Sequence, residues 1–439
     1  MARDGLALVF SSGLTAVFTL GFWTVAAHVN DAATVGRAAA EIAAITLVAG
    51  FAQLNLLGFF LRFLPASGHL ARRLVLTGYI AMTVAALVGG CVFVVLGLDR
   101  GFNGGGGAAE RTVFVAAIAA QAVFIVQDGV LTALGKATWV PVENLAATAL
   151  RFAVLLLPVA AVARFGIVGA WFIPVFAAVV VVNGFIIKGL SKALRSRAAG
   201  PPSLPPRHEL AKFVFAEYVN SLLNNAVTFA PPLLVLHLVD ASAAAYFNLP
   251  WLIVMTMQTL LWNVVMPFIA ESARSPESAR VSARRTIGFG LVLVVAATLV
   301  LLIAAPLVLG LEGGGFAGAG TPLLRTLAMS IPFTAVVVLY SAIAVVRRKI
   351  WPLVGLNTVG ALLLFGGLLE VLPVFGIAGG GLVYLAVQAV LALLGVTSII
   401  RWFRDTPRSS IAVASVLASP RGEIARHADH LVATSEVPR

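Results

Sequence analysis

Apolar runs, each about as long as a lipid bilayer is thick, follow one another along almost the whole chain of 439 residues. Hydrophobic residues make up 60% of the sequence and charged residues only 11%, whereas charged residues account for roughly 25% of a soluble domain. A bilayer core of roughly 30 Å requires about 20 apolar residues per helix. The sequence therefore predicts an all-α polytopic membrane protein.

On this measure the chain contains about twelve transmembrane helices. The first run lacks a small-residue cleavage site and is long enough to span, so we expect a retained helix and not a signal peptide. The expected spans are 6–27, 38–63, 74–98, 112–134, 142–163, 166–190, 213–238, 242–270, 286–310, 323–346, 351–372 and 376–400.

Lysine and arginine residues are concentrated in every second loop. About 23 basic residues fall on one side of the membrane and about five on the other, which places both termini in the cytoplasm. The net charge of +12 is therefore a topology signal and not an indication of nucleic-acid binding.

A motif at the end of the first span recurs in the second half of the chain. From His28 the sequence has Asp31, Ala32, Ala33 and Gly36; from His237 it has Asp240, Ala241, Ser242 and Ala245 at the same intervals. The stretch 165–169 likewise recurs at 375–379. Two copies of one unit predict two pseudo-symmetric six-helix lobes.

The predicted division has four parts. Residues 1–190 form the N-terminal lobe and 213–400 the C-terminal lobe. Between them, 191–212 is a basic, proline-containing cytoplasmic linker. The polar tail 401–439 is expected to be disordered or to lie on the membrane surface.

Polar side chains form a stripe on the first helix of each predicted lobe. Such groups cost about 2.5 to 3.5 kcal/mol each at the centre of a bilayer, so they normally face a protein interior or a wet cavity. The alternative is that they bond their own helix backbone or a neighbouring helix. The stripes comprise Ser12, Thr15 and Thr19 in the first span and Glu217, Asn220, Ser221, Asn224 and Thr228 in the seventh.

Charged residues mark further candidate sites. Glu41, Asn55 and Arg62 lie on nearly one face of the second span. Arg62 either extends to lipid phosphates or pairs with its repeat counterpart Glu271 in a salt bridge that opens and closes at the cytoplasmic mouth.

Three ionisable residues, Asp128, Glu143 and Arg151, lie around the fourth and fifth spans. Arg151 is either the structural partner of one of the two carboxylates or a cationic anchor for phosphate, which a guanidinium binds in a fork. The carboxylates are candidates for gating or ion coupling. Glu370 is expected at a solvated helix terminus.

The sequence lacks the motifs of several other function classes. It contains no Walker sequence, no metal-spaced histidine and cysteine set, and no nucleophile elbow. Its single cysteine, Cys91, lies in an apolar run and permits no disulfide. We therefore expect no ATPase of its own, no metal, no cofactor and no enzymatic activity.

Short motifs in the chain resemble those of the polysaccharide biosynthesis (Wzx-like) flippases, which belong to the multidrug/oligosaccharidyl-lipid/polysaccharide (MOP) exporter superfamily. The resemblance covers nearly the whole chain, and the order and spacing of the motifs carry it. The motifs are Leu61-Arg62-Phe63-Leu64-Pro65, Gln127-Asp128, Trp139-Val140-Pro141-Val142-Glu143-Asn144, Ala244-Ala245-Tyr246-Phe247 and Ala270-Glu271.

This resemblance implies a central cavity lined by the first two helices of each lobe. The implied substrate is a polyprenyl-diphosphate-linked oligosaccharide that crosses the bacterial inner membrane by alternating access, with Arg62 and Arg151 on the diphosphate. Membrane lipids and glycan polymerase or ligase proteins would be the partners. Glu217 and Asn224 depart from the most basic members of the family, so the cavity would not be uniformly cationic.

Three other functions fit parts of the sequence. A multidrug/cation antiporter of the same superfamily would use Glu217 and Asp128 as proton carriers, although the first stripe is hydroxylic. A glycan polymerase or ligase would need a sizeable external loop, and the expected loops are short. The chain could also be a membrane scaffold of a glycan assembly complex.

Overall fold

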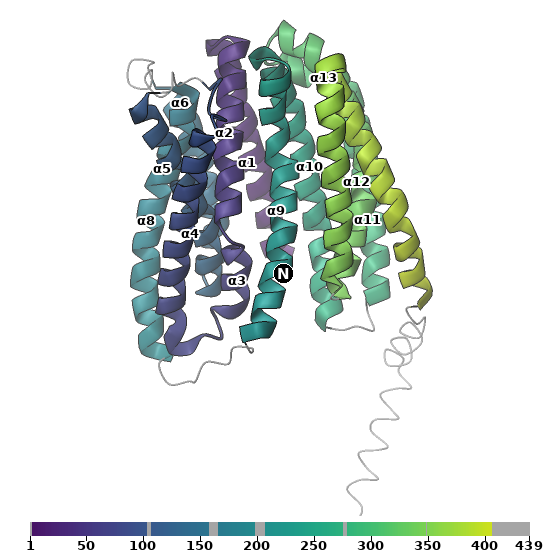
Figure 1. Ribbon diagram of the computed structural model, residues 1–439. Helices are drawn as coiled ribbons and strands as arrows, with labels where there is room; N and C mark the ends of the chain where they lie inside the picture. The colour runs from purple at the N-terminus through teal and green to yellow at the C-terminus, as the bar shows by residue number, and fades with distance from the viewer. Residues whose placement is uncertain are drawn as a thin grey trace, which may run out of the picture.

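The computed structural model describes residues 2–102, 107–157, 166–197, 207–274, 279–347 and 349–405. Within these ranges all regular structure is helical (Figure 1). The helices are α1 (Ala2–Val29), α2 (Ala32–Ala52), α3 (Leu56–Phe63), the 3-10 helix η1 (Gly68–Leu70), α4 (Ala71–Val95), α5 (Ala108–Ala133), α6 (Trp139–Leu155), α8 (Gly166–Arg197), α9 (Arg207–Leu238), α10 (Ala241–Arg274), α11 (Ala279–Gly310), α12 (Gly314–Val346) and α13 (Ile350–Asp405).

Nine helices in the described ranges are long and apolar enough to cross a membrane. This number is compatible with about twelve expected spans. Helix α13 covers two of them, because Gly376 (φ 58, ψ −153) interrupts a 56-residue stretch that turns back on itself. Helix α6 has 17 residues, and the described apolar part of α1 covers only Val17–Val29. The prediction of an all-α polytopic membrane protein is confirmed.

The second expected span is broken, and the prediction of one continuous helix over 38–63 was wrong. Helix α2 begins earlier, at Ala32, and ends at Ala52; α3 starts again at Leu56. Leu54 (φ 51) and Asn55 (φ 53) adopt left-handed backbone conformations between them. Asparagine tolerates this region, but leucine rarely does. The break gives α3, which carries Arg62, a direction of its own.

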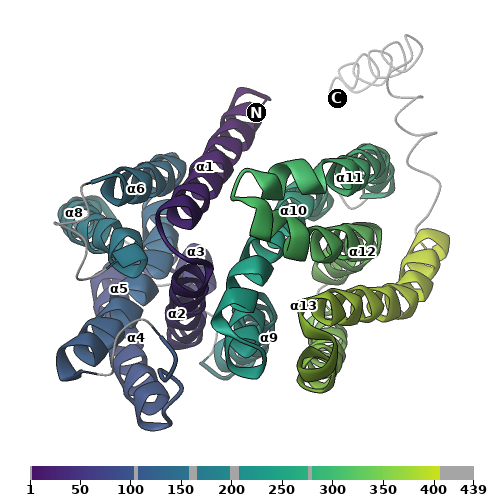
Figure 2. The same cartoon turned by 90° about the horizontal axis from the view of Figure 1, so that it is seen from above.

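Seen from above, α1 to α8 gather on one side and α9 to α13 on the other, with α2 next to α9 in between (Figure 2). The apolar cores follow the same division. One buried cluster runs from Phe22 to Ile186 and takes in Ala245 and Phe316 from the second half. Two further clusters lie wholly between Val235 and Trp402. Residues 198–206 of the predicted linker and 406–439 of the predicted tail lie outside the described residues, whereas the rest of the linker belongs to the end of α8 and the start of α9.

The two halves meet along a seam in which α2 packs against α9 and α10. Near the start of α2, a Cβ added to Gly36 would overlap the carbonyl oxygen of Ala241 and lie 2.8 Å from the amide nitrogen of Ala245. All three residues belong to the repeated motif. The two copies of that motif therefore pack directly on each other, and the glycine permits their close approach.

Further along the seam, polar side chains of α9 bond the backbone of α2. The Asn225 side chain donates to the carbonyl oxygen of Leu47 over 2.8 Å, and the Tyr218 hydroxyl donates to that of Phe51 over 2.9 Å. These two carbonyls belong to the last turns of α2, close to the end of its intrahelical hydrogen bonds. The seam therefore extends to the break at Asn55.

Candidate functional site

A polar pocket of about 230 Å³ lies in the second half, between α9, α10, α12 and α13. Its wall combines a carboxylate, amides, a hydroxyl and an indole with several valine, leucine and isoleucine side chains. The polar and aromatic lining residues are Glu217, Asn220, Asn224, Gln258, Trp262, Ser341 and Asn357.

Hydrogen bonds fix several of these side chains. The Asn357 amide of α13 donates to the Asn220 amide oxygen of α9 over 2.7 Å. One turn further along α9, the Asn224 amide donates to the backbone carbonyl of Asn220 over 2.8 Å. The amides are therefore ordered before any ligand arrives, and each keeps some free donor or acceptor capacity.

Only part of the two predicted stripes lines this pocket. Glu217, Asn220 and Asn224 do so. The hydroxyl groups of Thr228 and Thr19 instead donate to backbone carbonyls one turn earlier, each over 2.8 Å. These two threonines therefore bond their own helix backbone, which was the alternative to a place in the cavity wall.

Two other stripe residues, Ser221 and Thr15, are not among the described residues that line the pocket. Ser221 and Thr15 are half-buried on α9 and α1. The carbonyl oxygen of Thr15 accepts the hydrogen bond from Thr19. Ser12 lies in α1, but its side chain is outside the described part. Their role as cavity residues stays a prediction.

Arg62 is exposed near the end of α3 and interacts electrostatically with Glu217 on α9, across the two halves. The carboxylate of Glu271, the predicted partner, accepts a hydrogen bond of 2.6 Å from the Ser282 hydroxyl. In this conformation the cation of α3 therefore acts on a carboxylate that lines the polar pocket. A pairing of Arg62 with Glu271 in another conformation stays a prediction.

Asp128 and Glu143 belong to a hydrogen-bonded network that joins α5, α6 and α8. The Gln127 amide donates to Glu143, and the Asn144 amide donates to Asp128 over 3.1 Å. Asn183 of α8 donates to the Gln127 amide oxygen over 2.8 Å. One oxygen of each carboxylate, Oδ1 of Asp128 and Oε2 of Glu143, is buried without a partner in the described part. The network could bind a proton or a cation there.

Arg151 stacks on aromatic rings. Its guanidinium carbon lies 4.3 Å from the ring centre of Trp171 and 6.0 Å from that of Phe124. Its Nε is buried and has no hydrogen-bond acceptor in the described part of the chain. No ion pair within the described ranges joins it to Asp128 or Glu143, which amide groups bind instead. Stacking orients the guanidinium but leaves donor capacity free.

Sequence reasoning missed Gln258, Trp262, Ser341 and Asn357. Ser341 and Asn357 come from α12 and α13, outside the first two helices of each lobe, whereas Gln258 and Trp262 lie on α10, the second helix of the second lobe, and were passed over there. A search for amides inside apolar runs would have found Gln258 and Asn357, because an amide is costly in lipid wherever it occurs. Asn55, predicted to line the cavity, instead lies at the break and precedes the first turn of α3.

A buried carboxylate also lies between the halves at the end of the bundle where Gly36 is found. Glu312 is 4% exposed in the turn between α11 and α12, outside the membrane-spanning segments. Burial raises the pKa of its carboxyl, and a hydrogen bond with the Thr24 side chain of α1 opposes part of that rise. Together they move the pKa from 4.5 to about 7. Its protonated form therefore favours contact between the halves.

We expect that contact to weaken as the pH rises from 4.5 to about 7 and to change no further above that pH. Glu312 would ionise near 4.5 when the halves are apart and the carboxyl is exposed to water, but near 7 when they are in contact. Spin labels at Val29 and Leu311, which are 63% and 56% exposed, report the separation in a Cys91→Ser background. Glu312→Gln should hold the short distance at every pH. A distance in the unmodified protein that does not change with pH would contradict this role.

Comparison with known proteins gives the fold class. No protein-family model matches the chain, and no curated protein sequence does. An inward-facing multidrug resistance MATE family transporter of the MOP superfamily superposes with a TM-score of 0.61 at 16% identity, over 90% of this chain and 96% of that one. An outward-facing structure of such a transporter gives 0.62 at 16% identity, over 92% and 96%.

A third solved structure is a MOP superfamily transporter from Pyrococcus furiosus, described as having a binding pocket of reverse polarity and a different function. It matches with a TM-score of 0.59 at 17% identity, over 92% of this chain and 94% of that one. The protein is therefore an all-helical, multi-pass membrane protein with the fold of the MATE transporters of the MOP superfamily.

Proposed function

We propose that the protein exports a polyprenyl-diphosphate-linked oligosaccharide across the membrane by alternating access. Transporters with this fold have been solved in inward-facing and outward-facing conformations. A seam of small residues lies at one end, and α3, a charged segment separated from α2 by a helix break, lies near the other. An alternating-access cycle can use both. The wider resemblance to Wzx-like flippases supports the glycan substrate.

The observation that carries this proposal is the chemistry of the polar pocket. Sugar rings present hydroxyl groups at their edges and apolar C–H groups on their faces. Amide side chains, here Asn220, Gln258 and Asn357, both donate to and accept from hydroxyl groups. The Ser341 hydroxyl donates to the carbonyl oxygen of Val337 and can accept from a sugar hydroxyl. The indole of Trp262 offers the flat apolar surface that a sugar face can cover.

The diphosphate would bind the two arginines. Arg62 interacts electrostatically with the pocket residue Glu217, and an incoming diphosphate can compete for it. Arg151 has a buried Nε without an acceptor in the described part. A guanidinium binds phosphoryl oxygens through parallel hydrogen bonds, which makes both residues suitable ligands.

The remaining expectations belong to the same proposal. They are a bacterial inner-membrane location, cytoplasmic termini, lobes at 1–190 and 213–400, gating by Arg62 with Glu271, ion coupling at Asp128 and Glu143, and contact with membrane lipids and glycan polymerase or ligase proteins.

Rescue of a strain that lacks its lipid-linked glycan flippase tests the function. Asn357→Ala should reduce the rate of surface glycan appearance at least fivefold, because it removes the amide that binds Asn220 and lines the pocket. Asn263→Ala is the control, since that residue is exposed on α10 and not part of the pocket wall. Failure of the unmodified protein to restore surface glycan would count against the proposal.

The carboxylate of Glu217 in the pocket favours a second candidate, a multidrug/cation antiporter. In that case Glu217 would exchange a proton for a cationic substrate. Drug-efflux assays separate the two functions. If Glu217→Gln exports drugs as well as the unmodified protein at every external pH, Glu217 is not the proton carrier.

A further inference from the structure

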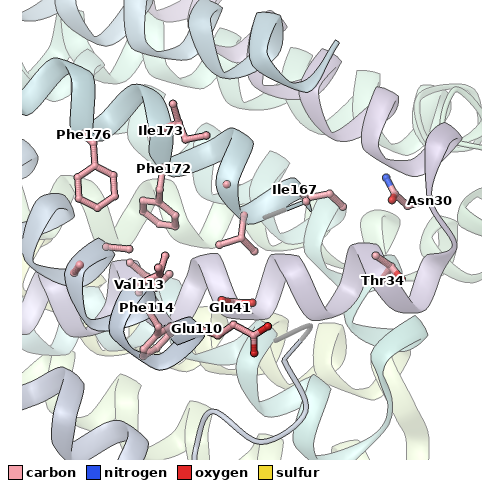
Figure 3. A pocket seen from close by; sticks show the side chains of 16 residues that line it. Asn30, Thr34, Glu41, Glu110, Val113, Phe114, Ile167, Phe172, Ile173 and Phe176 are labelled. Carbon is pink, nitrogen blue, oxygen red and sulfur yellow. The ribbon is translucent and has the colours of Figure 1, made fainter. Parts of the chain in front are cut away.

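Helices α5 and α8 of the first half differ in charge between their two ends. At one end a pocket of about 570 Å³ opens between α2, α5 and α8, and the carboxylates of Glu41 and Glu110 line it (Figure 3). The described residues of its wall include no lysine, arginine or histidine. At the other end, Lys136 follows α5 and Lys188 lies on α8, and both are exposed. An anionic ligand is therefore favoured at the second end only.

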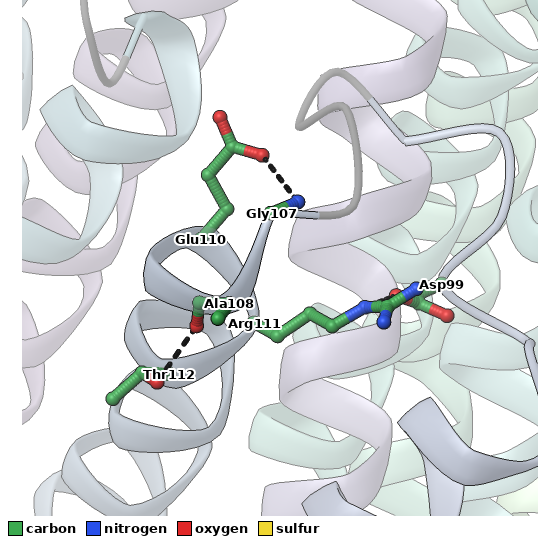
Figure 4. A network of polar contacts seen from close by, with 6 residues as sticks. All are labelled: Asp99, Gly107, Ala108, Glu110, Arg111 and Thr112. Carbon is green, nitrogen blue, oxygen red and sulfur yellow. Dashed lines mark hydrogen bonds and ion pairs between the residues drawn. The ribbon is translucent and has the colours of Figure 1, made fainter.

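The positive charges at the two ends also differ in their partners. At the acidic end, Arg111 binds the carboxylate of Asp99 over 2.9 Å (Figure 4). At the basic end, no ion pair within the described ranges involves Lys136 or Lys188. The carboxylate of Glu143, on the neighbouring helix α6, is buried and accepts a hydrogen bond from an amide side chain. The two lysines therefore keep positive charge that a ligand can neutralise.

An aromatic pair joins α6 and α8 at the basic end. The ring centres of Trp139, the first residue of α6, and Phe185 of α8 are 5.9 Å apart, and the two residues are 52% and 48% exposed. The amine nitrogen of Lys136 lies 6.0 Å from the ring centre of Trp139. Lys188 follows Phe185 by three residues and lies on the same face of α8. The two ammonium groups therefore border one aromatic surface.

This surface lies at the depth of the lipid headgroups. Helix α8 is apolar enough to cross the membrane from Gly166 to Lys188. Over that stretch it rises about 33 Å, and a bilayer core is roughly 30 Å thick. Tryptophan is enriched at the boundary between core and headgroups, and lysine extends its amine toward the phosphates. The residue types therefore fit the place that the helix length gives them.

Apolar side chains continue from the rings toward the centre of the bilayer. Val142 follows Trp139 by about one turn of α6 and is 61% exposed. Val181 precedes Phe185 by about one turn of α8 and is 56% exposed. Since α6 and α8 pack against each other, ammonium groups, rings and valines follow one another along the membrane normal. This order matches the phosphate, glycerol and acyl chain of a phospholipid.

We propose that this surface of α6 and α8 binds one anionic phospholipid of the surrounding bilayer. The phosphate binds Lys136 and Lys188, the glycerol region covers the two rings, and an acyl chain follows the two valines. The carboxylates at the other end of α5 and α8 repel the same headgroup, so the site belongs to one leaflet. The lipid is separate from the transported cargo, because none of these residues lines the polar pocket.

Native mass spectrometry of the purified full-length protein with added phosphatidylglycerol tests the site. The double variant Lys136→Gln/Lys188→Gln should raise the Kd for phosphatidylglycerol at least fivefold, because it removes both charges that attract the phosphate. The Kd for phosphatidylcholine, which has no net charge, should stay the same. Trp139→Ala keeps both lysines and should also weaken binding of phosphatidylglycerol, because it removes one ring of the pair.

A matched control removes the same charge from the second half. Lys349 and Arg401 occupy the positions of the repeat that correspond to Lys136 and Lys188, and both are exposed. Ser398 takes the place of Phe185 there. The double variant Lys349→Gln/Arg401→Gln should therefore leave the Kd for phosphatidylglycerol unchanged. The thermal unfolding midpoint without added lipid shows that each variant is folded.

Three results would overturn the proposal. The first is an equal Kd for phosphatidylglycerol in the Lys136→Gln/Lys188→Gln variant and the unmodified protein. The second is an equal loss of binding in the control variant, since positive charge alone would then explain the affinity. The third is tighter binding of a polyprenyl phosphate than of phosphatidylglycerol through the same two lysines, because the occupant would then be the cargo lipid.

Discussion

Replacing Gly36 with alanine should prevent the two halves of the protein from closing at one end, and transport should fall at least tenfold. The added Cβ would overlap the carbonyl oxygen of Ala241 and lie 2.8 Å from the amide nitrogen of Ala245. Both are backbone atoms within the first turn of α10, so no side-chain rotation can relieve the overlap. Closely packed helices respond to such an overlap by moving apart.

The measurement combines a distance with a transport rate. Val29 and Val239, which are 63% and 37% exposed, accept spin labels near the ends of α1 and α9, in opposite halves. Gly36→Ala should lengthen the distance between the labels. Gly366→Ala is the matched control, because a Cβ there meets open space. If Gly36→Ala left both the distance and the transport rate as they are, the seam would not be a closing contact.

The sequence predicted the duplication but not this contact. Matching residues at His28 to Gly36 and His237 to Ala245 indicate two copies of a unit, yet a repeat by itself does not say which surfaces face each other. The small residues Gly36 and Ala241 were the available signal, since close helix approach in membranes uses such residues. The break at Leu54 and Asn55 was less predictable, because neither glycine nor proline marks it.

Some residues of the candidate site could be predicted because each of them, taken alone, is costly to place in lipid. Glu217, Asn220 and Asn224 stand out because amides and carboxylates are rare in apolar helices, and they line the polar pocket. Glu41 stood out for the same reason, but Glu110, which lies just before the expected fourth span, did not. Which groups share a pocket depends on how α2, α5 and α8 pack, and spacing along the chain does not contain that information.

Replacing Arg151 with alanine should reduce glycan transport at least tenfold while the amount of protein in the membrane stays the same. A tenfold change corresponds to about 1.4 kcal/mol, which one hydrogen-bonded charge can supply. Arg151 has no ion-pair partner in the described part of the chain, and its Nε is buried without an acceptor there. Burying such a group costs stability, so its removal should not unfold the protein.

Lysine at this position separates charge from shape. Arg151→Lys keeps the cation but loses the planar fork and the stacking on Trp171, so we expect it to recover only part of the activity. Arg325→Ala is the control, because that arginine is exposed and its Nε donates to the carbonyl oxygen of Leu302. Rescue of a flippase-deficient strain, with immunoblots of the membrane fraction, provides the measurement. Full rescue by Arg151→Ala would show that the diphosphate is bound elsewhere, and Arg62 would then be its remaining cationic ligand beside the polar pocket.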